Sequence, residues 1–134
     1  MMYLTRRFAF SSCHRLESPD LDPAANACVY GPCTNLHGHN YRLDVTVRGT
    51  VDPKTGFFCN VMELAGIVEE LVVKQADHRF LNEVPIFAGM IITMENLATR
   101  IWTVIEPRLA AKGMELYEVR VYETEDHGAI LRKD

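Results

Sequence analysis

The stretch NYRLDVTVRGTV, residues 40–51, alternates between apolar and polar side chains. Successive side chains of a β-strand point to opposite faces, so this alternation gives the stretch one apolar and one polar face. The apolar face carries Leu43, Val45 and Val47, and the polar face carries Arg42, Asp44, Thr46 and Arg48. The stretch therefore predicts a strand that covers a hydrophobic core, and the rest of the chain is interpreted around it.

The segments on either side of this strand predict antiparallel partners for it. Residues 3–12, YLTRRFAFSS, are rich in aromatic side chains and predict a strand that ends near His14. Residues 17–32 are rich in Pro, Asp, Asn and Gly, which predicts a loop. After the central strand, VDPKTGFF at residues 51–58 contains turn-forming residues and predicts a hairpin partner at residues 56–59.

Two amphipathic helices are predicted in the second half of the chain. Apolar residues recur at spacings of three and four over residues 61–75, and Asn60 is placed to cap that helix. Thr93 is placed to cap a second helix, which we expect Pro107 to kink or close and Gly113 to end. The apolar stripe of the second helix comprises Leu97, Ile101, Val104, Ile105 and Leu109.

The chain then returns to strand-like sequence. LYEVRVYET at residues 116–124 and AILRK at residues 129–133 predict two further strands joined by a turn. The predicted order is a strand pair, two helices and a second strand pair. This order predicts an α+β fold with a small antiparallel sheet, organised as one domain over residues 1–134.

Composition narrows the classes of function. The chain has 134 residues, 48% of them hydrophobic, and a net charge of −4 from 14 basic and 18 acidic residues. The basic residues are scattered, so the sequence predicts neither a nucleic-acid nor a membrane partner, and a small anionic substrate must be held by a local site. Arg6 and Arg7 are not followed by the long apolar run of an export signal, so we expect a cytoplasmic protein. In that compartment the four cysteines are more typical of reduced thiols, ligands or a nucleophile than of disulfides.

The stretch CTNLHGHN, residues 33–40, concentrates groups that carry chemistry. In extended backbone His37 and His39 point to the same face, as two ligands of one metal must, and Gly38 between them lets backbone or substrate approach. A catalytic zinc site uses three protein ligands and an open fourth position. His14 is the best candidate for the third ligand, because its strand is expected to pair with the strand that follows His39. Alternatively, these histidines only satisfy backbone groups in a polar loop.

Two interpretations remain open for Cys33. It either completes a four-ligand structural zinc site or stays off the metal as a reactive thiol. The pair Asp77 and His78 favours the second, because a thiol acts as an acid or base when an imidazole accepts its proton and a carboxylate fixes that imidazole. Against this, Asp77 is also placed to cap a helix, with His78 on the surface. His127 lies in a predicted turn and receives no role.

Five segments, in order along nearly the whole chain, resemble the 6-pyruvoyltetrahydropterin synthase family, which includes the 6-carboxytetrahydropterin synthases of the queuosine pathway. The segments are FAFSSCHRL, YGPCTNLHGHNY, GTVDPKTGFFCNVMEL, ADHRFLN, and ITMEN followed later by VRVYET. The resemblance implies a tunnelling-type fold, in which a small antiparallel sheet carries two helices. It also implies that trimers join their sheets into a barrel and stack into hexamers, with active sites between subunits.

The same resemblance implies the roles of individual residues. His14, His37 and His39 would bind Zn²⁺, while Cys33, Asp77 and His78 would move protons. Glu123 would anchor the pterin ring, and Thr93 and Glu95 would also contact it. A carboxylate suits the anchoring role because it accepts paired hydrogen bonds from a pterin amino group and ring N–H.

The implied substrate is 7,8-dihydroneopterin triphosphate, and the product divides the family. Three residues separate Cys33 from His37, as in the branch that forms 6-carboxytetrahydropterin with release of acetaldehyde and triphosphate, so we predict that reaction. VYETEDHGAIL and VDPKTGFF instead resemble the animal branch, which releases triphosphate and keeps a 6-pyruvoyl group. A lyase that acts on a pterin without phosphates and a non-catalytic structural-zinc module are the further alternatives.

Overall fold

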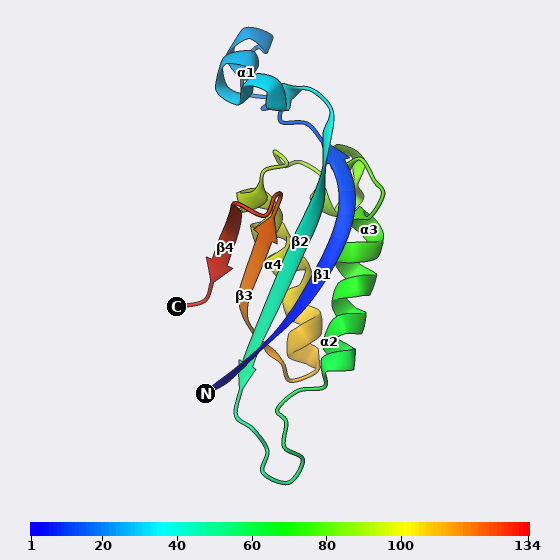
Figure 1. Ribbon diagram of the computed structural model, residues 1–134, viewed down its shortest axis with the longest axis vertical. Coiled ribbons are helices and arrows are strands. Elements are labelled where there is room, and N and C mark those ends of the chain that lie inside the picture. The colour runs from blue at the N-terminus through cyan, green and yellow to red at the C-terminus, as the bar shows by residue number, and fades with distance from the viewer.

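The computed structural model describes residues 1–134, and its frame is a four-stranded antiparallel sheet. The strands are β1 (Met2–His14), β2 (His37–Gly49), β3 (Glu115–Tyr122) and β4 (Gly128–Arg132), and they lie in this order across the sheet (Figure 1). The predicted α+β class with a small antiparallel sheet is confirmed. β1 and β4 are the two edge strands.

The central strand β2 has the two faces that its alternation predicts. Leu43, Val45 and Val47 are fully buried against the helices. On the opposite face Asp44 and Thr46 are also buried, because neighbours on β1 cover them. Arg7 donates two hydrogen bonds to the Asp44 carboxylate, and Thr5 shares a hydrogen bond with Thr46. The polar face of the sheet is therefore organised by side-chain pairs across strands.

The first helical segment follows the predicted range but is not a uniform α-helix. It comprises α2 (Val61–Val68), the π-helical turn η2 (Glu69–Val73) and α3 (Lys74–Ala76). Asn60 caps it as predicted, because its Oδ1 accepts hydrogen bonds from the backbone N–H groups of Met62 and Glu63.

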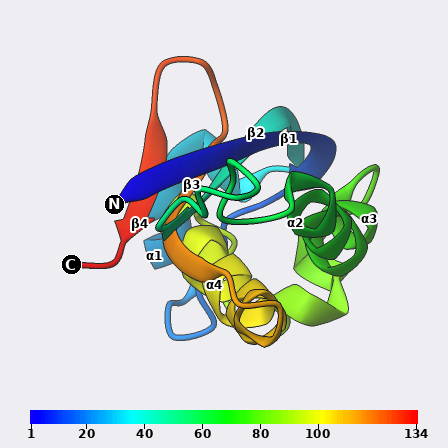
Figure 2. The same cartoon turned by 90° about the horizontal axis from the view of Figure 1, so that it is seen from below.

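The second helix, α4 (Met94–Ala111), begins after the predicted cap, where the Thr93 hydroxyl accepts from the N–H of Asn96. α4 continues through Pro107 to Ala111, so the proline does not close it, and Gly113 follows with a φ of 75°. Figure 2 shows α2, α3 and α4 on the same side of the sheet. Between the sheet and these helices lies a core of 26 buried hydrophobic residues.

Two predictions about loops are wrong. The segment 17–32 is not loop throughout, since it contains α1 (Pro23–Tyr30) and leads into the 3₁₀ turn η1 (Gly31–Thr34). Asp22 caps α1 and Pro23 occupies its first turn, a start signal that outweighs the turn-rich composition around it. Residues 56–59 form no strand, because β2 already pairs with β1 on one edge and β3 on the other.

The segment between α3 and α4 contains only short turns, η3 (Leu81–Glu83) and η4 (Pro85–Phe87). None of the helices combines the length and the apolarity that crossing a lipid bilayer requires. The end of β1, the start of β2 and the loops before α4 meet at one end of the sheet (Figure 1). That end carries the candidate site.

Candidate active site

Three imidazoles converge where β1 ends and β2 begins. In the β1–β2 register His14 lies opposite His37, and Ser12 lies opposite His39. The ring centroid of His14 is 4.6 Å from that of His37 and 5.1 Å from that of His39. One ring nitrogen from each of the three lies within 4.8 Å of the other two. The pairing that the sequence predicted therefore does bring the three histidines together.

The hydrogen bonds around the cluster prepare it for a metal. His14 Nδ1 lies 2.9 Å from the Ile92 carbonyl oxygen, and His37 Nδ1 lies 2.7 Å from the Asn35 carbonyl oxygen. A carbonyl only accepts, so each Nδ1 carries the proton and each Nε2 keeps its lone pair. The Nε2 atoms of His14 and His39 are buried without any partner. This donor set fits a Zn²⁺ ion with one open coordination position.

Burial keeps these imidazoles in the neutral form that a metal needs. The His14 side chain is 1% exposed, and burial lowers its pKa from 6.5 to about 4, although the Ile92 carbonyl acts in the opposite direction. Burial also lowers the pKa of His39, with the neighbouring His37 as a smaller cause. Near neutral pH a proton therefore does not compete with a metal for the Nε2 lone pairs of these two histidines.

Glu123, which follows β3 directly, faces the cluster. Its Oε1 lies 3.8 Å from His14 Nε2 and its Oε2 lies 4.0 Å from His39 Nε2. Burial raises the pKa of this carboxyl, while His127 and His37 act in the opposite direction and the charge of Glu95 adds a smaller rise. Glu95 is exposed in the first turn of α4, next to the cap residue Thr93. The three predicted pterin contacts therefore lie at the end of the sheet that carries the histidines.

Cys33 lies apart from the histidine cluster. It is half-buried in η1, and its carbonyl oxygen accepts a hydrogen bond from the Leu16 N–H at 2.8 Å. The group of mutually close ligand atoms comprises the three histidines and does not include the Cys33 thiol. The geometry of this chain thus offers an open three-histidine site rather than a closed four-ligand one.

Asp77 and His78 form a dyad fixed to β1. Asp77 Oδ2 lies 2.9 Å from His78 Nδ1, while its Oδ1 accepts from the Ser11 N–H at 2.9 Å. The His78 N–H in turn donates to the Ser11 carbonyl oxygen at 2.7 Å. The Ser11 N–H and the His78 hydrogen bond hold the pKa of Asp77 below its usual value. Asp77 does not cap the helical turn that follows it, because the N-cap position of η3 is Phe80, so that part of the alternative interpretation is wrong. The other part is confirmed, since the His78 side chain lies on the surface.

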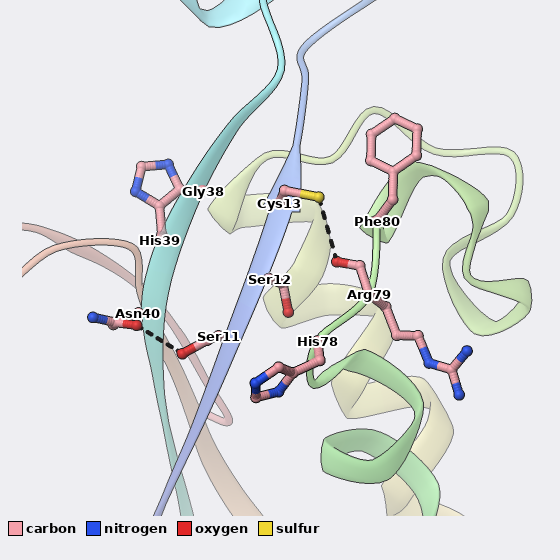
Figure 3. Close-up of a pocket in the computed structure, with 9 residues that line it drawn as sticks. All are labelled: Ser11, Ser12, Cys13, Gly38, His39, Asn40, His78, Arg79 and Phe80. Atoms are coloured by element: carbon pink, nitrogen blue, oxygen red, sulfur yellow. Dashed lines mark hydrogen bonds between the residues drawn. The ribbon is translucent and has the colours of Figure 1, made fainter.

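His78 of this dyad borders a cavity of about 460 Å³ between β1, β2 and the segment that follows α3 (Figure 3). The His78 side chain is 83% exposed, and its backbone has a φ of 58°, a left-handed conformation that is costly for a residue with a Cβ. In Figure 3 the His78 ring lies beside β1, and the His39 ring projects from β2 away from it. The lining residues are Ser11, Ser12, Cys13, Gly38, His39, Asn40, His78, Arg79 and Phe80.

Cys33 is absent from this lining, so a single chain does not join the thiol and the dyad in one cavity. Sequence reasoning missed Ile92 and Ser11, which act through backbone atoms and leave no signature in the residue type. It also missed the buried phenol of Tyr41, whose ring centroid lies 5.4 Å from that of His39. The residues that sequence alone could find were those whose own side chains carry the chemistry.

The family described as 6-pyruvoyl tetrahydropterin synthase matches residues 3–134. The chain belongs to this family. The 6-pyruvoyl tetrahydrobiopterin synthase of Drosophila melanogaster is 48% identical over 126 residues, which cover 91% of this chain and 74% of that protein. The solved structure of Caenorhabditis elegans 6-pyruvoyl tetrahydropterin synthase superposes with a TM-score of 0.84 at 32% identity, covering 99% of this chain and 96% of that one.

One archaeal relative carries the name of the other branch. An Archaeoglobus fulgidus protein, provisionally named 6-carboxy-5,6,7,8-tetrahydropterin synthase, is 38% identical over 101 residues, covering 75% of this chain and 79% of that protein. Its identity and its coverage of this chain are both lower than those of the Drosophila protein. The comparisons therefore favour the pyruvoyl branch over the carboxy branch that the spacing of Cys33 and His37 predicted.

Proposed function

We propose that this family member is a zinc-dependent 6-pyruvoyltetrahydropterin synthase. It converts 7,8-dihydroneopterin triphosphate to 6-pyruvoyltetrahydropterin and releases triphosphate. The observation that carries the proposal is the match to a protein named for this reaction at 48% identity over 91% of the chain. The three-residue spacing between Cys33 and His37 is a single local feature, and it weighs less than a match along the whole chain.

Zn²⁺ held by the three histidines would activate the substrate side chain. A bound Zn²⁺ lowers the pKa of a hydroxyl group that it coordinates. His14, His37 and His39 would hold the ion, and the carbonyl groups of Ile92 and Asn35 would fix two of these rings. Gly38 keeps β1 and β2 close at this point, since a Cβ there would lie 3.3 Å from the Ser12 carbonyl oxygen.

Glu123 orients the pterin relative to the metal. Its carboxylate accepts hydrogen bonds from the amino group and a ring N–H of the pterin. Glu123 lies 3.8 Å from His14 Nε2 and 4.0 Å from His39 Nε2. A pterin ring anchored by Glu123 would therefore place the substrate side chain beside the three histidines. Thr93 and Glu95 supply further polar contacts from the start of α4.

Cys33 and the Asp77–His78 dyad transfer protons between carbon and oxygen atoms of the substrate side chain. Each transfer needs a donor or acceptor within hydrogen-bond reach of the reacting group. One chain does not bring the thiol and the dyad into a shared cavity, so the complete site lies between subunits. The unpaired edges of β1 and β4 support such an assembly, because exposed sheet edges favour pairing with another copy.

The experiment that tests the proposal is mass spectrometry of the products formed by zinc-loaded protein from 7,8-dihydroneopterin triphosphate. We expect 6-pyruvoyltetrahydropterin and inorganic triphosphate without acetaldehyde. A 6-carboxy pterin with acetaldehyde would instead assign the chain to the carboxy branch. Unchanged substrate would favour the non-catalytic zinc module.

Cys33→Ser is the matched control for that experiment. With the thiol in its proposed role, the variant keeps its zinc and loses turnover by about 10²- to 10⁴-fold, the usual range for a general acid or base. A variant that loses zinc would show that Cys33 is a metal ligand.

A further inference from the structure

A second cavity, of about 510 Å³, opens where the β2–β3 ladder ends. The last paired residues of that ladder are Arg42 and Tyr122, and beyond them the two strands separate. The cavity is bordered by His39 and Glu123 of the candidate site and also by two arginines, Arg7 and Arg42. It therefore connects the metal and pterin positions to the polar face of the sheet.

Arg42 differs from the other arginines on this face of the sheet. Arg7 is bonded to Asp44, while Arg120 and Arg132 are both bonded to Glu118. Arg42 takes part in no ion pair, and its Nε atom is buried without a hydrogen-bond partner. An unpaired buried donor costs free energy. An anionic ligand that accepts hydrogen bonds from this guanidinium would offset part of that cost.

The guanidinium of Arg42 is held in place without using its N–H groups. Its Cζ atom lies 4.4 Å from the centroid of the Tyr122 ring, a cation–π arrangement. The Tyr122 ring in turn lies against Gly128, where a Cβ would come within 2.6 Å of it. Stacking fixes the plane of the guanidinium and leaves its N–H donors free.

Among the charged residues around the cavity, Arg42 is the cation without a direct ion-pair partner. The charge of Arg7 is matched by Asp44, which occupies the Nε and Nη2 groups of that arginine. Two carboxylates face the cavity, Glu123 beside the histidines and the exposed Glu125. Glu123 is committed to the pterin in the proposed function, and the chain as a whole carries a charge of −4. Of the two arginines that border the cavity, Arg42 is therefore the one whose charge no ion pair occupies.

We propose that Arg42 binds the phosphate chain of the substrate and so makes the site selective for a phosphorylated pterin. His39 and Arg42 are three residues apart on one strand, or roughly 10 Å at about 3.3 Å per residue. An odd spacing puts their side chains on opposite faces of β2, and both residues border the cavity at the end of the β2–β3 ladder. The phosphates would reach Arg42 through this opening while the pterin stays at Glu123. The inference rests on the proposed function for the identity of the substrate, but not for the existence of the anion site.

The first test measures binding of inorganic tripolyphosphate by calorimetry to the zinc-loaded full chain and to Arg42→Gln. Loss of a hydrogen-bonded charge pair predicts that the variant binds about 10- to 100-fold more weakly. Arg6→Gln is the matched control, because it removes the same charge from β1 outside the cavity and is expected to bind within about twofold of the parent. Zinc content before and after each titration shows whether the probe has removed the metal.

The second test compares KM for the phosphorylated and the phosphate-free pterin. Arg42→Gln should raise KM about tenfold or more for the phosphorylated substrate and leave the phosphate-free one unchanged, while Arg42→Lys recovers part of the loss. Equal tripolyphosphate binding by Arg42→Gln and the parent, or no binding by the parent, overturns the inference. If the product is a 6-carboxy pterin and Arg42→Gln nevertheless binds tripolyphosphate more weakly than the parent, the proposed function fails and the phosphate site stands.

Discussion

The Nδ1 atom of His14 lies 2.9 Å from the carbonyl oxygen of Ile92, two residues before α4 begins. This contact joins the end of β1 to the start of α4. It fixes the tautomer of a buried imidazole and aims its Nε2 atom at the two other histidines. The candidate metal site thus depends on the packing of α4 against the sheet as well as on the side chains of His14, His37 and His39.

The first prediction concerns metal binding. His14→Ala should lower zinc affinity by more than the roughly 10- to 100-fold that is typical of changes outside the ligand set, because it removes a ligand. The measurement is zinc content after dialysis against a graded chelator. His127→Ala is the control, since His127 is exposed in the β3–β4 turn and is not part of the cluster. Equal zinc retention by both variants would contradict the assignment.

The second prediction concerns the pH dependence of stability in metal-free protein. The pKa of His14 falls from 6.5 to about 4 on folding, so below pH 6.5 the unfolded chain binds a proton that the folded chain excludes until about pH 4. Stability is therefore complete above pH 6.5 and is lost as the pH falls toward 4. Burial lowers the pKa of His39 as well, which acts in the same direction.

From His14 alone the free energy of unfolding should fall by about 2 kcal/mol between pH 7 and pH 5. Urea unfolding with excess chelator measures this change, in a window where ordinary carboxyl groups remain ionised. His14→Gln should flatten the dependence, and His127→Ala should retain it. A flat profile in the parent protein would show that His14 titrates normally.

The third prediction separates the chemistry of His78 from its backbone strain. His78→Ala and His78→Gly should both reduce kcat by about 10²- to 10⁴-fold, because both remove the imidazole. Their stabilities should differ, because the φ of 58° strains a residue with a Cβ and not glycine. We expect the glycine variant to be about 1 kcal/mol more stable by urea unfolding. Equal stabilities would mean that the left-handed backbone relaxes in solution.

Much of the fold was predictable because its signals are local. The alternation at residues 40–51 and the caps Asn60 and Thr93 each identify an element from neighbouring residues alone. The strand predicted at residues 56–59 was wrong because strand formation also requires a free edge, and β2 has none. α1 was missed because Gly and Pro next to it dominated the composition of its segment.

The candidate site was predictable to the extent that its groups are side chains. The grouping of His14, His37 and His39 followed from strand pairing and the two-residue spacing of H-G-H. The bonds that orient the site come from the backbone of Ile92, Asn35 and Ser11, whose side chains carry no signal for that role. The unpaired state of Arg42 is equally invisible in sequence, because it depends on which carboxylates the other arginines bind.

The last prediction tests whether each site needs two copies of the chain. Cys33 lies outside the cavity that His78 borders, so Cys33→Ala and His78→Ala should each be inactive alone. In a hybrid oligomer one interface pairs the intact thiol of one copy with the intact dyad of the other. Co-expression with two different tags, followed by purification on both, should therefore give turnover well above the sum of the separate variants. The control pairs Cys33→Ala with a chain carrying both substitutions, in which no interface has both groups. Turnover at the level of that control would mean that thiol and dyad act within one subunit, after a rearrangement that brings η1 to the end of α3.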